Sequence, residues 1–308
     1  MSAASPAEKT WTTLELLRWT TDYFSTQGIE GARLDAETLL AFALGCRRID
    51  LYVNFEKPAS PDERARFRAL VKRRAGERVP VSHLVGSKEF WSLPLRVSSE
   101  VLTPRPDTET LVEAALDRLP ERDGDYRVLD VGTGSGAVAL AIAHERPGAA
   151  ICATDISASA LQISRTNAEQ LLLSEKVRFL EGSLFEPVEG ERFDLVVSNP
   201  PYLARRDATS LAPELGHEPE EALFGGEDGL AVLEPLVAGA PAVLAPGGWL
   251  AVEIDPGQVE RVAAAFAEAG FRDVKSHCDL AKRPRVVTGR REGQQAAETG
   301  QGPGSIRQ

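Results

Sequence analysis

The amino-acid sequence predicts a mixed α/β fold, and two observations carry this prediction. Before residue 80, apolar residues recur at helical spacing, which is typical of amphipathic helices packed into a small bundle. From residue 127 onward, short apolar runs alternate with helical stretches, which is typical of a doubly wound parallel sheet. We therefore expect a small α-helical bundle, then a β-hairpin linker, and then a Rossmann-like domain with a seven-stranded sheet.

The composition is that of a globular protein with a substantial core. Of the 308 residues, 43% are hydrophobic and 26% are charged, and the length suits two domains. The net charge of −11 argues against a large nucleic-acid footprint, which usually forms a basic face. No apolar run is long enough to span a bilayer, and residues 1–10 lack a secretory signal pattern. We therefore expect a cytoplasmic protein with no membrane partner and no direct nucleic-acid substrate.

Cysteine and histidine are few and dispersed along the chain. Their spacing fits neither a metal site nor an even set of disulfides, so no metal and a reducing environment are expected. The residues concerned are Cys46, Cys152, Cys278, His83, His144, His217 and His277.

Residues 1–80 are expected to form the helical domain. Helices are predicted at 12–27 and 34–44, and a third is predicted after Pro61. Gly28 directly follows the first of them, as is common at helix ends. Arginine and lysine residues between 64 and 74 form the one basic cluster of the chain, which indicates either a solvated helix face or a docking surface.

Residues 81–103 are expected to form the linker. Apolar and polar residues alternate here, which predicts strands at 81–86 and 88–97 with a turn between them. A helix is then expected from Thr103 to Leu119, because its first turn is rich in proline and acidic residues.

Residues 104–290 are expected to form the second domain. Its predicted strands lie at 128–131, 149–154, 177–180, 193–198, 249–254, near 274 and at 286–287. Its predicted helices after the opening one lie at 136–145, 157–172, 229–244 and 258–269. Residues 291–308 are rich in Gly, Gln and Ala and lack an apolar period, which predicts a disordered tail.

Residues 193–202, Phe-Asp-Leu-Val-Val-Ser-Asn-Pro-Pro-Tyr, are the most informative stretch. The apolar run predicts a strand that is buried on both faces, and two successive prolines must end it because neither can donate to a sheet. Asn199 and Pro200 each precede a proline, which favours extended backbone. Both are therefore expected just past the carboxyl end of a parallel strand, where ligands bind in open α/β sheets.

Asn-Pro-Pro-Tyr at 199–202 resembles the signature of S-adenosylmethionine-dependent methyltransferases that modify a planar amide or amino nitrogen. Such a nitrogen is a poor nucleophile, because its lone pair is delocalised. The Asn199 side-chain oxygen and the Pro200 carbonyl could both accept from its NH2 group and favour the positive charge that develops on it. Tyr202 offers an aromatic face for a flat group. Asn199, Pro200 and Tyr202 are therefore the predicted catalytic residues.

A glycine turn at 132–136 follows the strand at 128–131 and opens a helix. Glycines allow a tight turn and a close approach to a ligand, and Gly132, Gly134 and Ala137 also satisfy a dinucleotide fingerprint. Asp155 closes the next strand, where an acid can hydrogen-bond ribose hydroxyls or, alternatively, cap the helix that begins near Ser157. Only the Asn-Pro-Pro-Tyr segment favours S-adenosylmethionine over a nicotinamide cofactor.

With these motifs, nearly the whole chain resembles the peptide chain release factor glutamine methyltransferase family, often called HemK. The matching segments are 88–95, 102–109, 128–136, 155–157, 199–202, 222–230, 244–249 and 279–290. The resemblance implies a helical substrate-recognition domain, a hairpin linker and a methyltransferase domain. It also implies methylation of the glutamine side-chain amide in the Gly-Gly-Gln motif of class I release factors.

By the same resemblance, matching positions receive roles. S-adenosylmethionine, which leaves as S-adenosylhomocysteine, would be held by Gly132, Thr133, Gly134, Ser135, Gly136, Asp155, Leu184 and Asn199. Leu184 would lie near the adenine. The glutamine would be bound by Asn199, Pro200, Pro201 and Tyr202. Ser183 and Asp255 depart from the family pattern, which usually has Asp and Gly there.

Two other functions fit part of the sequence. An adenine-N6 nucleic-acid methyltransferase shares the tetrapeptide, but it would need base flipping and a basic channel. A nucleotide-binding regulatory module without catalysis would not require an intact Asn-Pro-Pro-Tyr segment. We expect a monomeric enzyme whose partners are class I release factors.

Overall fold

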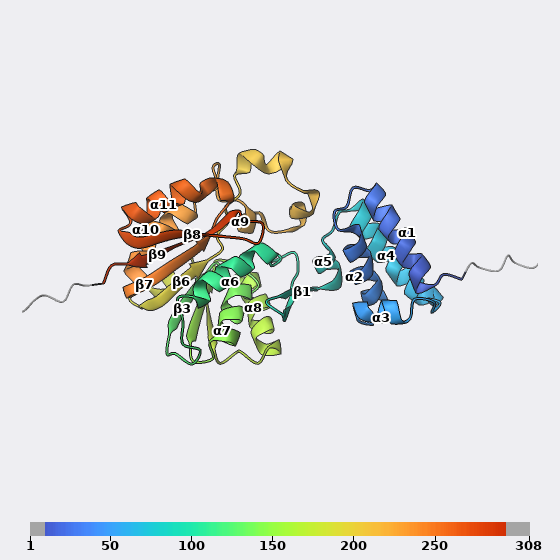
Figure 1. Cartoon of the computed structure of the whole chain (residues 1–308), viewed down its shortest axis with the longest axis horizontal. Helices are drawn as coiled ribbons and strands as arrows, with labels where there is room; N and C mark the ends of the chain where they lie inside the picture. Colours follow the sequence, from blue (N-terminus) through green and yellow to red (C-terminus); the bar gives the residue numbers. More distant parts are fainter. Residues whose placement is uncertain (1–9, 294–308) are drawn as a thin grey trace, which may run out of the picture. The chain divides into compact units, whose positions relative to one another are not determined.

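The computed structural model describes residues 10–293, which divide into two compact units (Figure 1). The first unit comprises the described residues up to Pro104 together with Arg206–Phe224. The second comprises Arg105–Arg205 and the described residues from Gly225 onward. The predicted boundaries at residues 80 and 103 stay predictions, and from position 294 the predicted tail lies outside the described residues.

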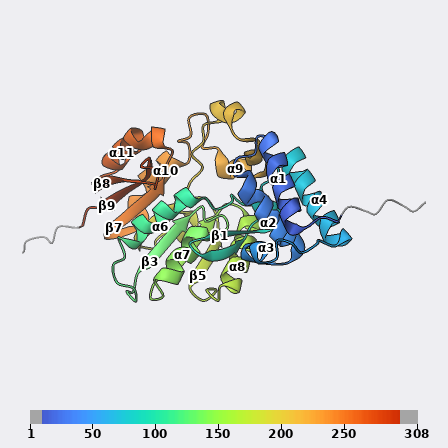
Figure 2. The same ribbon diagram turned by 45° about the vertical axis from the view of Figure 1, so that its right-hand side comes forward.

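The first unit is a helical bundle. Its main helices are α1 (Thr13–Thr26), α2 (Ala32–Leu44), α3 (Arg48–Val53) and α4 (Pro61–Gly76). α2 packs against α1 and α4, and the three lie side by side in Figure 2. Thr12 and Ser60 begin α1 and α4 with reciprocal capping boxes, which satisfy backbone N–H groups at the helix starts. Phe24, Leu39 and Leu40 are completely buried between the helices.

The strand predicted at 81–86 is wrong, because Val81–Val85 forms a short helix, α5. Val81, Leu84 and Val85 also stand at helical spacing, and all three pack against the core of the bundle. The second predicted strand, 88–97, is instead folded back on itself as the hairpin, with β1 (Ser87–Phe90), which begins one residue before it, paired with β2 (Leu93–Arg96). Its turn at Trp91 and Ser92 has φ values of 52° and 58°, which the twist of a two-residue hairpin requires.

The first unit also contains Arg206–Phe224, which follows the Asn-Pro-Pro-Tyr segment in the chain. This segment consists of short turns: η3 (Arg205–Ser210), η4 (Pro213–His217) and α9 (Glu220–Leu223). The buried Arg74 pairs with Glu214 at 2.8 Å and with Asp35 at 2.7 Å. An ion pair between side chains this well shielded is costly to break, so it anchors the segment to α4.

The second unit is built around a seven-stranded sheet in the order β5-β4-β3-β6-β7-β9-β8, and the predicted fold class is confirmed. The strands are β3 (Arg127–Val131), β4 (Ala150–Asp155), β5 (Val177–Glu181), β6 (Phe193–Ser198), β7 (Leu244–Glu253), β8 (Phe271–Cys278) and β9 (Pro284–Arg291). Five neighbouring strands are parallel, and β9 and β8 finish the sheet in antiparallel fashion.

Helices cover both faces of this sheet (Figure 1). They are α6 (Glu109–Leu116), α7 (Ala137–Glu145), α8 (Ala158–Gln170), α10 (Leu233–Val243) and α11 (Val259–Glu268), with the turns η1 (Pro106–Thr108), η2 (Glu186–Val188) and η5 (Pro256–Gln258). Asp130 of β3 contacts α7, whereas its neighbours Leu129 and Val131 pack with residues of α10 and α11. Because successive strand residues point to opposite faces, α7 and the α10–α11 pair cover opposite sides.

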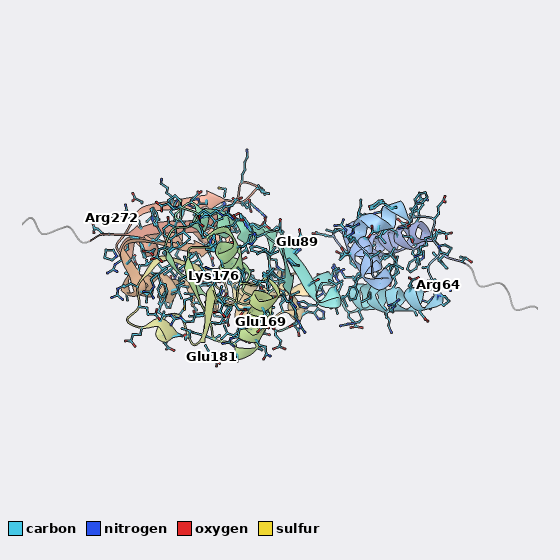
Figure 3. The ribbon with its side chains drawn as sticks, turned by 90° about the horizontal axis from the view of Figure 1, so that it is seen from below. Arg64, Glu89, Glu169, Lys176, Glu181 and Arg272 are labelled. Atoms are coloured by element: carbon cyan, nitrogen blue, oxygen red, sulfur yellow. The ribbon has the colours of Figure 1, made fainter. Side chains whose placement is uncertain are left out.

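Charged side chains lie mostly on the outside of the second unit, because its core is apolar and burying an unpaired charge is costly. Figure 3 labels Glu169 on α8, Lys176 and Glu181 along one border of the sheet, and all three are exposed. Within residues 10–293, no helix is both long and apolar enough to cross a membrane.

Candidate active site

The predicted site residues meet at the carboxyl edge of the parallel strands. Val131 of β3 is paired with Ser198 of β6, so Gly132 and Asn199 are the next residues on neighbouring strands. The strand order reverses between these two strands, because β4 and β5 lie on one side and β7 on the other. Such a switch point opens a crevice in which ligands bind. The Ser198 hydroxyl donates to the Val131 carbonyl at 2.7 Å and so links the ends of β6 and β3.

The glycine turn is held by the end of β4. The backbone N–H groups of Gly132 and Thr133 both donate to the Thr154 carbonyl, at 2.8 and 2.9 Å. Gly132 and Gly134 have φ values of 72° and 56°, and a Cβ added at either would meet no atom within 4 Å. The turn therefore presents bare backbone to open space, as a loop that approaches a ligand closely must.

Two carboxylates support this turn from within. Asp130 is buried and accepts from the Thr133 hydroxyl at 2.7 Å and from Ala139 N at 3.2 Å. Burial raises the pKa of Asp130 to about 7, although these hydrogen bonds lower it. Asp155 accepts from Gly134 N at 2.8 Å and from Ser157 N at 2.9 Å. Asp155 therefore couples the glycine turn to the start of α8.

The other predicted cofactor residues surround the same edge. The Thr133 side chain points to Asp130, and Ser135 is buried with its carbonyl bonded to Asn167 Nδ2 at 2.8 Å. A Cβ on Gly136 would press on Leu140 and Ser164, both at 3.1 Å. Leu184 follows β5 with a φ of 46°, and its carbonyl accepts from the Thr154 hydroxyl at 3.4 Å. Ser183, the first departure from the family pattern, is exposed beside it.

Asn199 has one satisfied and one unsatisfied side-chain group. Its Nδ2 donates to the Thr108 hydroxyl oxygen at 3.2 Å. Its Oδ1 is buried and has no hydrogen-bond partner. Buried polar atoms without a partner are rare in folded proteins, and leaving one unpaired costs about 1–3 kcal/mol. The Asn199 oxygen therefore lacks a donor within the described residues.

Tyr202 is fixed through both its ring hydroxyl and its backbone. The hydroxyl donates to Glu253 Oε1 at 3.1 Å, and the carbonyl accepts from Gln258 Nε2 at 3.0 Å. Burial, followed by the nearby charge of Glu253, raises the pKa of Tyr202 well above its usual range. Gln258 is itself held by Asp255, whose N–H donates to Gln258 Oε1 at 3.1 Å. Asp255, the second departure from the family pattern, thus supports the Asn-Pro-Pro-Tyr segment indirectly.

Glu253 ends β7 directly beside Asn199, because Ser198 is paired with Val252. Its side chain is fully buried. Burial raises the pKa of Glu253 to about 7, against hydrogen bonds from Thr108 and Tyr202 and the charge of Arg285, which lower it. Its second oxygen, Oε2, is buried without a partner.

Two glycines of the 222–230 segment pack against the backbone of the tetrapeptide. A Cβ on Gly225 would collide with the Pro201 carbonyl, and one on Gly229 would collide with the Tyr202 carbonyl. Both collisions involve backbone atoms, which cannot move aside as a side-chain end can. Glycine at these positions therefore lets the two loops lie directly on each other.

Beyond Glu253 lies a cluster of two acidic and two basic side chains. Arg285 is buried and contacts Asp107 at 2.9 Å and Asp279 at 3.4 Å. Arg283 contacts the same two carboxylates, at 3.3 and 2.9 Å. The cluster ties η1, which carries Thr108, to β9.

Sequence reasoning had missed Thr108, Glu253 and Gln258 as members of the site. Thr108 lies within the 102–109 segment that carries the family resemblance, and that segment was the available signal. Nothing in the local pattern at the end of β7 distinguishes Glu253 from an ordinary strand-end carboxylate. Asn199, Tyr202 and the glycine turn are brought to one edge, as predicted, and their individual roles stay predictions.

The arrangement fits a nucleoside cofactor on one side and an NH2 group on the other. The glycine turn offers free space above its backbone, and a carboxylate such as Asp155 can accept about four hydrogen bonds in total. The unpaired Asn199 oxygen can accept one more hydrogen bond. Within residues 10–293, no group of three or more His, Cys, Asp or Glu side chains is arranged to hold a metal ion.

Comparison with known proteins shows what the chain is similar to. Two family descriptions match it, the PrmC N-terminal domain over residues 15–86 and the methyltransferase small domain over residues 107–228. A release factor glutamine methyltransferase of Geobacter sulfurreducens is 45% identical over 281 residues, which cover 91% of this chain and 97% of that protein. One of Xylella fastidiosa is 48% identical over 266 residues, covering 86% of this chain and 95% of that protein.

Among solved structures, the fold resembles the 16S rRNA N2 G1207 methyltransferase of T. Thermophilus in complex with AdoMet and guanosine. The TM-score is 0.52 at 22% identity, and the match covers 67% of this chain and 50% of that one. At this identity the likeness concerns the fold of the sheet and its helices.

Proposed function

The chain belongs to the release factor glutamine methyltransferase family, and we propose that it methylates the glutamine side-chain amide in the Gly-Gly-Gln motif of class I release factors. It is an S-adenosylmethionine-dependent protein-glutamine N-methyltransferase, as predicted from the sequence. The comparisons support this function over the nucleic-acid alternative, because the relatives named for it match over nearly the whole chain.

The observation that carries the proposal is the unpaired, buried oxygen of Asn199 at the switch point of the sheet. A primary amide presents two N–H donors, and this oxygen together with the Pro200 carbonyl can accept both. Neither acceptor can stabilise a group without donors. The site is thus suited to an NH2 group and unsuited to a carboxylate, which accepts only.

The chain's own residues then contribute in two ways. The two acceptors interact more strongly with the amide nitrogen as positive charge develops on it, which lowers the barrier. The Tyr202 ring, held by Glu253 and Gln258, provides a flat surface for the amide plane. S-adenosylmethionine, when bound, supplies the electrophilic methyl group.

The residues proposed to hold that cofactor lie across the switch point from Tyr202. Gly132 and Gly134 would let its amino-acid part approach the backbone, and Asp155 would accept from the ribose hydroxyls while still bonded to Gly134. Leu184 and the exposed Ile156 are the apolar residues proposed to contact the adenine.

We further propose that the enzyme acts as a monomer in the cytoplasm, where release factors serve translation. The proposed partner is a protein, and the overall negative charge argues against a nucleic-acid partner. Sedimentation of the purified chain, alone and with a release factor, would test both the monomeric state and the partner.

The decisive experiment is mass spectrometry of a class I release factor after incubation with the enzyme and S-adenosylmethionine. We expect one added methyl group on the Gly-Gly-Gln peptide and none on a release factor whose motif glutamine is changed to glutamate. DNA and RNA are assayed in parallel under the same conditions. Methyl transfer to adenine in either, without transfer to the release factor, would overturn the proposal.

A further inference from the structure

We propose that Gln258 is a positioning residue, whose side-chain NH2 group clips the Asn-Pro-Pro-Tyr segment to the loop at 225–229. This inference rests on the proposed function, because it concerns how the segment proposed to receive the substrate amide is held in place. Gln258 ends η5 and is half-buried. Its Nε2 donates to the Tyr202 carbonyl at 3.0 Å and to the Gly229 carbonyl at 3.2 Å. One side chain thus bonds two loops that are separate in the chain.

The backbone partners of Gln258 determine which way its amide faces. A carbonyl can only accept, so the group that bonds the Tyr202 and Gly229 carbonyls must be the NH2 group. On the other side, the Asp255 N–H donates to Oε1 at 3.1 Å, and an N–H can only donate. The NH2 group has two protons, which is one for each carbonyl. The amide therefore has a single orientation in which all of these groups are paired.

The two carbonyls depend on this NH2 group for their hydrogen bonds. Within residues 10–293, no backbone N–H donates to either of them. The loops also lie directly on each other here, because a Cβ on Gly229 would collide with the Tyr202 carbonyl and with Gln258 Nε2. Without the donor, two part-buried acceptors would face each other unpaired, which is unfavourable. Loss of the NH2 group should therefore loosen the contact between the loops.

Backbone hydrogen bonds continue this contact beyond Tyr202. Gly225 N donates to the Leu203 carbonyl at 3.0 Å, and Arg205 N donates to the Gly226 carbonyl at 2.9 Å. These bonds secure the residues that follow the tetrapeptide, whereas the side-chain clip acts on its last residue. The clip is therefore the part of the contact that can hold the tetrapeptide itself in position.

Tyr202 is consequently held at two points by the connection between β7 and α11. Glu253 at the start of this connection accepts from the ring hydroxyl at 3.1 Å, and Gln258 at its end donates to the carbonyl. Asp255 stiffens the connection, since its Oδ1 accepts from Gly257 N at 2.8 Å. With both the backbone and the end of the ring fixed, the ring cannot swing freely. We therefore expect the clip to act on alignment of the substrate amide and not on the cofactor.

The test uses Gln258→Glu, which removes both donors but keeps an acceptor for the Asp255 N–H. Glutamate serves as well as glutamine in this kind of helix cap, so η5 should be preserved. We expect kcat/KM for release-factor methylation to fall by about tenfold or more, because a displacement of about 1 Å within a site can cost about a hundredfold in rate. S-adenosylmethionine affinity and melting temperature should change little. Gln170→Glu, at the exposed last residue of α8, makes the same charge change and is the matched control.

A second variant and hydrogen exchange separate a clip from a cap. Gln258→Met has a similar size but lacks both donor and acceptor, so a clip predicts that both variants lose kcat/KM. If only Gln258→Met were impaired, Gln258 would be a cap and the inference would be overturned. Exchange at the Gly225 and Arg205 N–H groups should be faster in Gln258→Glu, while Gly132 and Thr133 on the cofactor side keep the wild-type rate. Unchanged exchange at the first pair, or equal acceleration at all four, would also contradict the clip.

Failure of this inference is distinguishable from failure of the proposed function. If the wild-type enzyme methylates the release factor and Gln258→Glu does so equally fast, only the clip is wrong. If the wild-type enzyme does not methylate the release factor at all, the proposed function is wrong. Hydrogen exchange then still tests the clip, because it needs no substrate.

Discussion

The two sides of the switch point differ in how their polar groups are satisfied. On the β3–β4 side, Asp130 and Asp155 each accept at least two hydrogen bonds from residues of the same edge. On the β6–β7 side, Asn199 Oδ1, Glu253 Oε2 and Arg285 Nε are all buried without partners. Within the described residues, the second side thus carries buried polar atoms without partners, and the two carboxylates of the first side are bonded.

This difference indicates a division of labour. A turn whose supports are internally bonded is rigid, and rigidity suits the binding of a common cofactor with little reorganisation. Unpaired acceptors have a cost in the free protein, and such atoms are typical of sites where an interaction is made only with the reacting group. We therefore expect changes on the first side to affect cofactor affinity and changes on the second side to affect turnover.

The largest effect is expected for Asn199→Ala. Removing one preorganised hydrogen-bonding group from an active site commonly lowers kcat by about 10²–10³-fold. We expect a loss of at least about a hundredfold in kcat, with a smaller loss of S-adenosylmethionine affinity, measured by steady-state kinetics and calorimetry. Asn54→Ala, on the exposed end of α3, is the control. A variant with near-wild-type turnover would show that the oxygen has no role in catalysis.

Gly134→Ala should show the opposite pattern. Gly134 has a φ of 56°, where a Cβ costs about 1–2 kcal/mol, and that Cβ would stand in the space above the turn. We expect S-adenosylmethionine affinity to fall by about 10–30-fold, while kcat at saturating cofactor changes little. Gly76→Ala is the matched control, because its Cβ also meets no atom but its φ lies outside the left-handed region. Equal effects of the two substitutions on affinity would contradict the assignment.

The pH dependence should separate the two buried carboxyl groups. The Tyr202 hydroxyl donates to Glu253, whose pKa is about 7, so protonation of Glu253 below pH 7 should lower kcat by about as much as losing this hydrogen bond does, about fivefold. Thr108, Tyr202, Arg285 and Asp107 are the groups that face this carboxyl and set its pKa. Glu253→Gln should remove the acid limb of the pH profile, measured with saturating cofactor.

Two controls accompany the pH experiment. Asp130 is the other carboxyl group whose pKa is about 7. The Asp130→Asn enzyme should keep the acid limb of the kcat profile, because Asp130 lies on the cofactor side. Stability should move in the opposite direction from activity. A pKa raised by burial stabilises the fold below the unfolded value of about 4.5, and this contribution is lost as the pH rises through about 7. The melting temperature should therefore fall as the pH rises from about 4.5 to 7. If it rises over this range, in both the wild type and Glu253→Gln, neither Glu253 nor Asp130 has a pKa raised by burial.

The sequence sufficed for the parts of the site that depend on local patterns. The apolar run before Asn199 predicted the central strand β6, and the two prolines after Asn199 predicted where it ends. The glycine turn in the same way predicted the end of strand β3. Because parallel strands end at the same edge, these two local signals were enough to bring Gly132 and Asn199 together. The register of β3 and β6 then places them side by side.

The remaining parts could not be predicted, because they depend on contacts between distant segments. Thr108 and Asn199 are 91 positions apart, and Tyr202 and Glu253 are 51 apart. The helix at Val81–Val85 was mistaken for a strand because five residues can satisfy both periods, and packing against α2 decided between them. The turn at Trp91 and Ser92 lacks the Asn-Gly pair that usually signals such a hairpin.

The smallest effect is expected for Tyr202→Phe, and it sharpens the comparison most. The ring remains, so the flat surface is kept, but the hydroxyl bond to Glu253 is lost. A hydrogen bond of this kind contributes about 1 kcal/mol, so kcat should fall by about fivefold with cofactor affinity unchanged. Tyr126→Phe, which removes a hydroxyl that accepts from Glu121 N far from Asn199 in the chain, is the control. If Tyr202→Phe lowered cofactor affinity more than kcat, Tyr202 and Glu253 would belong to the cofactor side, and the proposed division between the two sides would be wrong.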